Sequence, residues 1–183
     1  MKKLIVLFIS LFVIVGCSCS KQMTAKDAVK DYLEQYRLHD EKVLKALDEY
    51  IATNQELSDN QRNEYEEVLK KQYKNLKYKI TNETYDGDEA LVTVTITVFD
   101  LYKAQTDANN YLNQHQDEFL DEDGVYDKSK FLDYKLEQMK NYKDTTDYTI
   151  EFHVVKNDDS KWEVQELSTD DLEKIHGIFQ YES

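Results

Sequence analysis

The sequence predicts an α+β domain in which three N-terminal helices pack on a four-stranded antiparallel sheet. Three observations lead to this fold class. Apolar residues recur at helical spacing from residue 25 to residue 76. Two later pairs of segments alternate apolar and polar residues, as half-buried antiparallel strands do. Between these two expected hairpins the helical spacing returns over residues 102–143, so we expect a helical insertion between them.

The three N-terminal helices are expected to begin at capping residues. Thr24 is followed three positions later by Asp27, and Ser58 is followed by Gln61, so both pairs fit the capping-box pattern. Asp40 is the expected cap of the helix between them. The expected helices cover residues 25–38, 41–51 and 59–76.

The first expected hairpin turns at Gly87, which lies between two aspartates. It leads into the clearest strand of the chain, residues 90–98, which alternates valine or isoleucine with threonine. The helical insertion that follows is expected to contain two helices, separated near Gly124.

The second expected hairpin joins residues 148–154 to residues 161–165. A short last helix follows, for which Thr169 is the expected cap. Gly177 is expected to end that helix, because glycine readily adopts the left-handed conformation found after many helices.

Acidic residues dominate the composition. The chain has 37 Asp and Glu residues against 23 Lys and Arg residues, a formal net charge of −14. Nucleic acid and anionic lipid headgroups repel a surface of this kind, so we expect no nucleic-acid partner. The chain contains only four glycines and no glycine-rich phosphate-binding loop.

The N-terminal segment has the pattern of an export signal. Two lysines precede an apolar run over residues 4–15, which is shorter than the roughly 20 residues that a membrane-spanning helix needs. Gly16 and Cys17 end this run, and the segment Ile14-Val15-Gly16-Cys17 resembles the lipobox of bacterial lipoproteins. The resemblance implies cleavage after Gly16 and attachment of a diacylglycerol to Cys17. Two acyl chains anchor a protein stably, whereas one binds a membrane only marginally.

The expected organisation is a signal peptide over residues 1–16, a lipidated tether over 17–23 and a single α+β domain over 24–183. Removal of the signal peptide, with its two lysines, would take the formal charge to −16. The extended tether would reach about 20 Å, which keeps the domain close to the outer face of the cytoplasmic membrane. Cys19 is a poorer lipobox cysteine. The alternative is an ordinary secreted protein in which Cys17 keeps a free thiol.

Three segments of the mature chain resemble lipoproteins of Gram-positive bacteria whose domain is similar to nuclear transport factor 2. These segments are residues 28–36, the turn at 86–90 and the hairpin at 148–164. The family has a cone-shaped sheet around a helix hairpin, so the resemblance implies a concave pocket between the sheet and the helices. Residues 102–143 are longer than the family pattern. The fold itself does not fix a function.

Several of the fourteen tyrosines fall on core-facing positions of the expected helices and strands. A buried tyrosine needs a partner for its hydroxyl group. Such a set indicates either a polar-edged pocket or a packed core with hydroxyl groups at its rim. Asp100, at a strand end, is the acidic residue nearest to this region. The candidate pocket residues are Tyr32, Tyr36, Tyr78, Asp100 and Tyr148.

The sequence contains no catalytic or metal-binding motif that we can identify, and we expect no cofactor and no metal. His115 and Glu118 are spaced for one helix face but lack a second ligand pair. The acidic cluster around Gly124 does not fit an EF-hand, because Phe119 would occupy its first ligand position. His176, in the last turn of the last helix, is expected to cap the helix C-terminus, where a cation interacts favourably with the helix dipole and the last carbonyl groups.

The sequence therefore favours a membrane-anchored extracytoplasmic lipoprotein that acts as a non-catalytic binding or interaction module of the cell envelope. Its partner would be an envelope protein or a small ligand. The alternative is a small-molecule-binding or enzymatic cone-fold domain that uses the pocket between sheet and helices. A third possibility is a lipoprotein that blocks access to a membrane target. An inward acid with a raised pKa beside a tyrosine would favour the enzyme, and a filled apolar interior would favour the interaction module.

Overall fold

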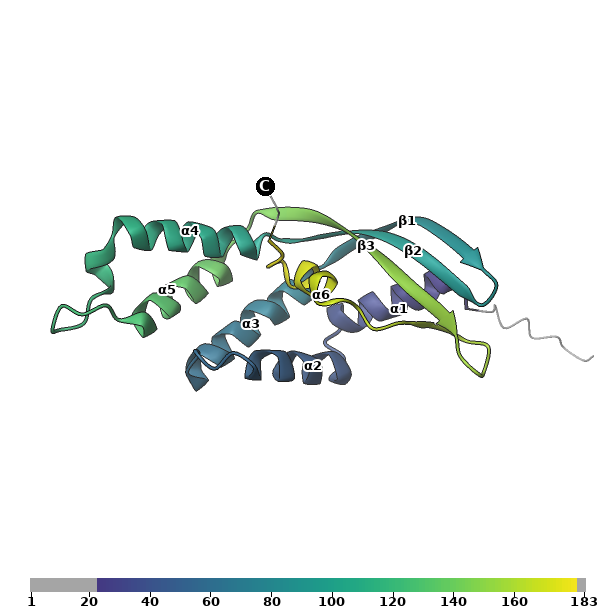
Figure 1. The fold of residues 1–183 in the computed structure, drawn as a ribbon, viewed down its shortest axis with the longest axis horizontal. Coiled ribbons are helices and arrows are strands. Elements are labelled where there is room, and N and C mark those ends of the chain that lie inside the picture. Colours follow the sequence, from purple (N-terminus) through teal and green to yellow (C-terminus); the bar gives the residue numbers. More distant parts are fainter. Residues whose placement is uncertain (1–22, 181–183) are drawn as a thin grey trace, which may run out of the picture.

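The computed structural model describes residues 23–180 and confirms the α+β fold class (Figure 1). The predicted signal peptide, its cleavage after Gly16 and the lipidation of Cys17 lie outside the described residues. In chain order the elements are α1 (Ala25–Arg37), α2 (Glu41–Ala52), α3 (Asp59–Asn75), β1 (Lys77–Asp86), β2 (Glu89–Phe99), α4 (Leu101–Gln114), the short 3₁₀ helix η1 (Gln116–Phe119), α5 (Lys128–Asn141), β3 (Thr145–Lys156), β4 (Trp162–Val164) and α6 (Thr169–His176).

Both predicted capping boxes are present at the starts of α1 and α3. The Thr24 hydroxyl accepts a hydrogen bond from the backbone N–H of Asp27 at 3.2 Å, and the Asp27 carboxylate accepts one from the backbone N–H of Thr24 at 3.2 Å. Ser58 and Gln61 form the same reciprocal pair. Asp40 caps α2. These side chains accept hydrogen bonds from backbone N–H groups that the first helical turn leaves unpaired. For this reason the capping residues predicted where the helices start.

The strands form an antiparallel meander in the order β1-β2-β3-β4. β2 pairs with β3 over its whole length, from Glu89 opposite Val155 to Phe99 opposite Thr145. The valines and isoleucine on one face of β2 are buried, while the threonines between them are only partly buried. The helical layer covers the buried face, so the sheet has one apolar and one wetter face, as the alternation predicted.

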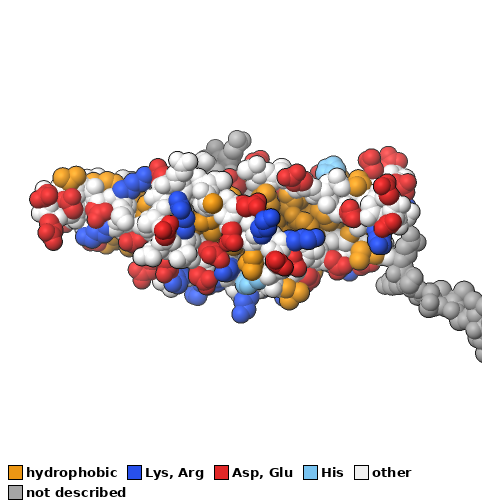
Figure 2. Space-filling model, turned by 90° about the horizontal axis from the view of Figure 1, so that it is seen from below, with side chains coloured by type: hydrophobic (Ala, Val, Ile, Leu, Met, Phe, Trp, Pro, Cys, Tyr) orange, Lys and Arg blue, Asp and Glu red, His pale blue; other side chains and the backbone are white. Residues whose placement is uncertain are grey.

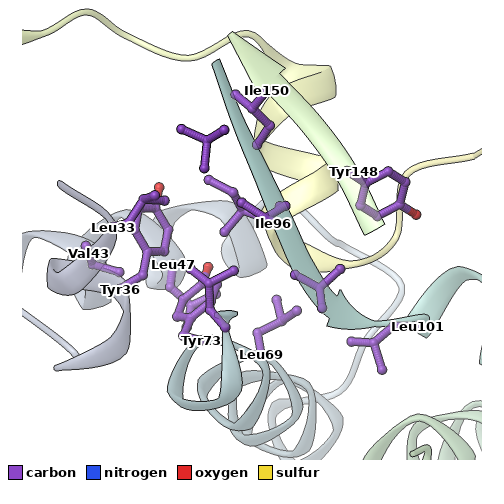
Figure 3. Packing of buried hydrophobic residues seen from close by; sticks show 14 of the residues in the cluster. Leu33, Tyr36, Val43, Leu47, Leu69, Tyr73, Ile96, Leu101, Tyr148 and Ile150 are labelled. Atoms are coloured by element: carbon purple, nitrogen blue, oxygen red, sulfur yellow. The ribbon is translucent and has the colours of Figure 1, made fainter. Parts of the chain in front are cut away.

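The main core lies between this sheet face and the N-terminal helices. Figure 3 shows side chains from α1, α3 and the strands that converge in one layer, among them Leu33, Leu69 and Ile96. All three of these side chains are completely buried. Burial of one such aliphatic side chain contributes roughly 1.5–3 kcal/mol to folding. Among the described residues, no helix is long and apolar enough to cross a membrane.

Helix α6 closes the helical layer. Its cap is Ser168, whose hydroxyl accepts a hydrogen bond from the backbone N–H of Asp171 at 3.1 Å. The prediction of Thr169 as cap was therefore wrong by one residue: the extended backbone at Ser168 leaves its hydroxyl facing the first turn, and Thr169 is already helical. Gly177 ends the helix with a φ of 72°, as predicted.

Gly177 also sits at a tight junction of three elements. A Cβ atom on this residue would lie 2.2 Å from the carbonyl oxygen of Phe99 and 2.3 Å from Nε2 of Gln72. The fully buried Gln72 side chain, on α3, donates to the Phe99 carbonyl at 3.1 Å and accepts from the Phe99 N–H at 2.9 Å. The backbone N–H of Tyr102 donates to the Gly177 carbonyl at 2.8 Å. The base of α4 is therefore fixed to α3 and α6.

Helices α4 and α5 form a hairpin that projects beyond the end of the sheet (Figure 1). This hairpin is the helical insertion predicted over residues 102–143. It has a small apolar cluster of its own, formed by Ala108, Phe119 and Phe131, with Tyr111 and Tyr134 packed against it. The hairpin and the sheet together give the molecule its elongated shape, with the hairpin loop at one end.

Candidate functional site

The predicted pocket tyrosines of α1 pack into the space between sheet and helices. The hydroxyl groups of Tyr32 and Tyr36 lie 3.4 Å apart. The Tyr36 ring meets the Tyr73 ring edge-to-face at 5.0 Å, and the Tyr32 ring meets Phe152 of β3 at 5.9 Å. Burial raises the pKa of the Tyr36 hydroxyl, so this group stays protonated. The rings fill this part of the interior, and the pocket role of Tyr32 and Tyr36 stays a prediction.

The remaining three candidate residues make separate contacts. Tyr78 donates a hydrogen bond to Glu34 at 3.0 Å. Asp100 caps α4 by accepting from the backbone N–H of Lys103 at 2.9 Å. Tyr148 donates a hydrogen bond to the backbone carbonyl of Phe179, which follows α6, at 3.2 Å. The structure thus brings Tyr32 and Tyr36 together and gives Tyr78, Asp100 and Tyr148 other partners.

Glu34, the acid beside Tyr78, forms an ordinary ion pair with Arg37. Arg37 lies 2.6 Å from the Glu34 carboxylate and, by hydrogen bonding, holds its pKa below the usual range, while the Tyr78 hydroxyl acts in the same direction. A general acid needs the opposite shift, a raised pKa that keeps its proton at neutral pH. The pair of Glu34 and Tyr78 therefore lacks the raised carboxyl pKa that would indicate a proton-transfer site.

His176 corrects one expectation from the sequence. It was expected to cap the C-terminal end of α6 as a cation, but only 4% of it is exposed. Its ring faces Tyr50 at 4.7 Å and Tyr73 at 5.8 Å, and its Nδ1 has no hydrogen-bond partner within residues 23–180. Burial lowers the pKa of this imidazole to about 4. His176 is therefore a neutral core residue, because contacts from α2 and α3 outweigh the attraction of the helix end.

Gln61 has a second role that the sequence did not reveal. Besides completing the α3 capping box, its Nε2 donates to the backbone carbonyl of Ser129 at 3.1 Å and to the Asp133 carboxylate at 2.8 Å. Near the other end of α5, Lys140 forms a salt bridge with Glu64 at 2.7 Å. These contacts join α5 to α3 and set the direction of the hairpin. The only sequence signal is a glutamine at a capping position, which reports the local bond and not the distant one.

The loop at the hairpin tip is well ordered by its own hydrogen bonds. Residues Leu120 and Tyr126 form a β-bridge, and the Asp121 carboxylate accepts from the backbone N–H groups of Asp123 and Val125 at 2.9 and 2.8 Å. This arrangement leaves Val125 61% exposed and Tyr126 47% exposed. We call residues 120–127 the hairpin tip. It presents two apolar side chains on a fixed backbone, flanked by carboxylates.

Acidic side chains spread along the molecular surface, including the end formed by the hairpin tip (Figure 2). His115 and Glu118 pair with each other at 3.4 Å near this end. No group of three or more His, Cys, Asp or Glu residues within positions 23–180 is arranged to hold a metal ion. The carboxylate of Asp121 is engaged by the loop backbone instead.

Comparisons with known proteins give little beyond this geometry. No protein-family model matches the chain, and no curated protein matches it. A solved structure of a candidate lipoprotein, ycdA from Bacillus subtilis, is similar over 85% of this chain, with 16% sequence identity and a TM-score of 0.44. The match covers 47% of that protein, so the chain spans about half its length. A likeness at this level carries no argument, and the function is inferred from the sequence and the structure.

Proposed function

We propose that the protein is a lipid-anchored lipoprotein on the outer face of the cytoplasmic membrane, and that it is a non-catalytic interaction module of the cell envelope. In this proposal Cys17 carries the lipid and the hairpin tip contacts a protein partner. The observation that carries the proposal is the placement of the start of the described chain and of the hairpin tip at opposite ends of the molecule (Figure 1).

One contact and the order of the elements define these ends. The Tyr85 side chain, at the end of β1, contacts the backbone of Ala25, so the start of α1 lies beside the β1–β2 turn. Helix α4 begins at the opposite end of β2. The eleven residues of β2 span about 36 Å, and the fourteen residues of α4 span about 21 Å. An anchor before Met23 would therefore hold one end at the membrane and present the tip to the surrounding envelope.

The packing of the interior favours an interaction module over an enzyme. The sheet face that the cone-fold resemblance assigns to a pocket is occupied by Val92, Val94 and Phe152, all completely buried. The hydroxyl groups of Tyr32 and Tyr36 beside it lie 3.4 Å apart, and Glu34, which accepts the Tyr78 hydrogen bond, has a lowered pKa. Small-molecule binding or catalysis in the cone remains the alternative, and it would require this packing to open.

The chemistry of the tip defines the partner. Val125 and Tyr126 offer an apolar contact of the kind found at the centres of protein interfaces. The flanking carboxylates of Asp121, Glu122 and Asp123 favour a basic rim on the other side. We therefore propose a partner protein with an apolar socket bordered by Lys or Arg, and the net charge of the chain argues against a polyanion.

Site-specific photo-crosslinking in cells that make the full-length protein tests this proposal. A crosslinking amino acid at position 125 should give a discrete product with one envelope protein, and Tyr126→Ser should reduce that product at least tenfold. The matched control places the same crosslinker at Glu49, an exposed position on α2.

Identical products from positions 49 and 125 would contradict an interface at the tip. So would the absence of any product from position 125 in cells where the protein is lipidated and folded.

A further inference from the structure

A cleft separates the loop between α2 and α3 from the base of the helix hairpin. It consists of two adjoining hollows of about 100 and 350 Å³, which share Asn54, Glu56 and Tyr65. The smaller, inner hollow is lined further by residues of α4 and α5, and the larger by the end of α2. This cleft is a different place from the interior between sheet and helices, where the sequence led us to expect a pocket.

The inner hollow contains Lys135, whose ammonium group lies over the Phe131 ring, 5.7 Å from its centre. The Lys135 side chain is half-buried, and within residues 23–180 its ammonium group makes no hydrogen bond and no salt bridge. Glu56, the carboxylate that acts on it, is bound to Lys128 at 2.8 Å. Burial disfavours the charged form and lowers the pKa of Lys135. An anion in the hollow would restore the stabilisation that the ammonium loses with its hydration.

The walls around Lys135 differ in character. One wall is aliphatic and buried, formed by Leu57, Leu132, Leu136 and Met139. The lining also includes residues with polar groups, among them Tyr65 and Gln105. Tyr65 lines both hollows, and Tyr50 lines the outer one. A ligand that fits must therefore combine a single negative charge with a short hydrocarbon group.

Size and charge narrow the ligand class further. The inner hollow is about the volume of three water molecules at liquid density, so it admits only a few non-hydrogen atoms. A phosphate dianion is strongly hydrated and would face both an aliphatic wall and the Glu56 carboxylate. A carboxylate carries one charge and accepts the hydrogen bonds that an ammonium and a hydroxyl group donate.

We propose that this cleft binds an aliphatic carboxylate, with Lys135 pairing with the carboxylate and the aliphatic wall receiving the hydrocarbon group. The carboxylate belongs either to a free short-chain acid, held in the inner hollow, or to the C-terminus of a peptide whose preceding residue occupies the outer hollow. The site is independent of the hairpin tip, so either proposal can fail without the other.

Titration of the full chain with matched probes tests the site. The probes are isobutyrate and its neutral isostere isobutyramide, and then the dipeptide Ala-Ala and its C-terminal amide. Binding is followed by calorimetry and by the NMR signal of the Met139 methyl group, which lies in the wall. We expect saturable binding of a carboxylate, with a shift of this methyl signal, and no saturable binding of either amide.

Lys135→Met, which keeps the length and removes the charge, should weaken binding at least tenfold. Lys130→Met, on the exposed side of the same helix, is the matched control and should bind as the wild-type protein does. Tighter binding of Ala-Ala than of isobutyrate would identify a peptide C-terminus as the source of the carboxylate. Tighter binding of isobutyrate would identify a free acid. Three outcomes would overturn the proposal. The wild-type protein could respond equally to carboxylates and amides, neither carboxylate could reach saturation, or Lys135→Met could bind the carboxylates as tightly as the wild-type protein.

Discussion

The buried imidazole of His176 makes the stability of the protein depend on pH in a calculable way. The unfolded chain binds a proton on this residue below a pKa of about 6.5, whereas burial lowers the pKa in the folded protein to about 4. Between these two values the unfolded state holds more protons, so the free energy of unfolding falls as the pH falls. Stability is fully present above pH 6.5 and decreases towards pH 4.

The magnitude follows from the size of the pKa shift. Each unit of difference corresponds to about 1.4 kcal/mol, so His176 should remove about 3 kcal/mol of stability between pH 6.5 and pH 4. The variant His176→Phe keeps an aromatic ring, cannot titrate, and leaves no bond unmade at Nδ1, which has no partner among residues 23–180. Between pH 6.5 and pH 4, the free energy of unfolding of this variant should fall by about 3 kcal/mol less than that of the wild-type protein.

Urea unfolding at four pH values between 7.5 and 4.5 measures this difference. Carboxylates contribute equally to both proteins, so the difference between them isolates His176. His153→Phe is the matched control, because it makes the same substitution at a histidine that is exposed on β3. If the stabilities of wild-type protein and His176→Phe differ by a constant amount at every pH, the imidazole is not buried in its neutral form and our interpretation is wrong.

Three further variants test the packing by equilibrium unfolding. Trp162→Ala should destabilise the protein by about 3 kcal/mol, because its buried ring packs against Tyr85, and a near-neutral effect would place the ring outside the core. Gln72→Leu should cost about 3 kcal/mol by leaving the backbone N–H and C=O of Phe99 unpaired, and no loss would mean that water replaces the amide. Gly177→Ala should cost about 2–4 kcal/mol through its positive φ and the contact with Phe99, and unchanged stability would contradict this junction.

The elements that the sequence predicted correctly depend on neighbouring residues. Thr24 and Ser58 bond to backbone groups three positions away, so their pattern contains all the partners involved. The alternation in β2 reports directly that one face of the strand is buried. Gly177 has a positive φ of 72°, a conformation that glycine adopts without the steric cost of a Cβ atom. In each case the determining interaction lies within one helical turn or one strand.

The features that sequence analysis missed depend on contacts between distant segments. His176 is neutral because Tyr50 and Tyr73 surround it, and neither lies near it in the sequence. The direction of the helix hairpin depends on Gln61 bonding to α5, 68 positions away. The half-buried position of Lys135 beside Glu56 arises only where α5 meets the loop after α2. Helical periodicity identifies a face of a helix but not the segment that will cover it.

The central claim is that the chain is anchored through a lipid on Cys17, and the mass of the mature N-terminal peptide tests it most directly. Protein extracted from the membrane fraction should begin at Cys17 with a diacylglycerol on the sulfur and without residues 1–16. Cys17→Ala should remain an unlipidated precursor. A wild-type protein that carries an unmodified Cys17 thiol, or a Cys17→Ala protein that is processed and labelled with lipid as before, would contradict the account.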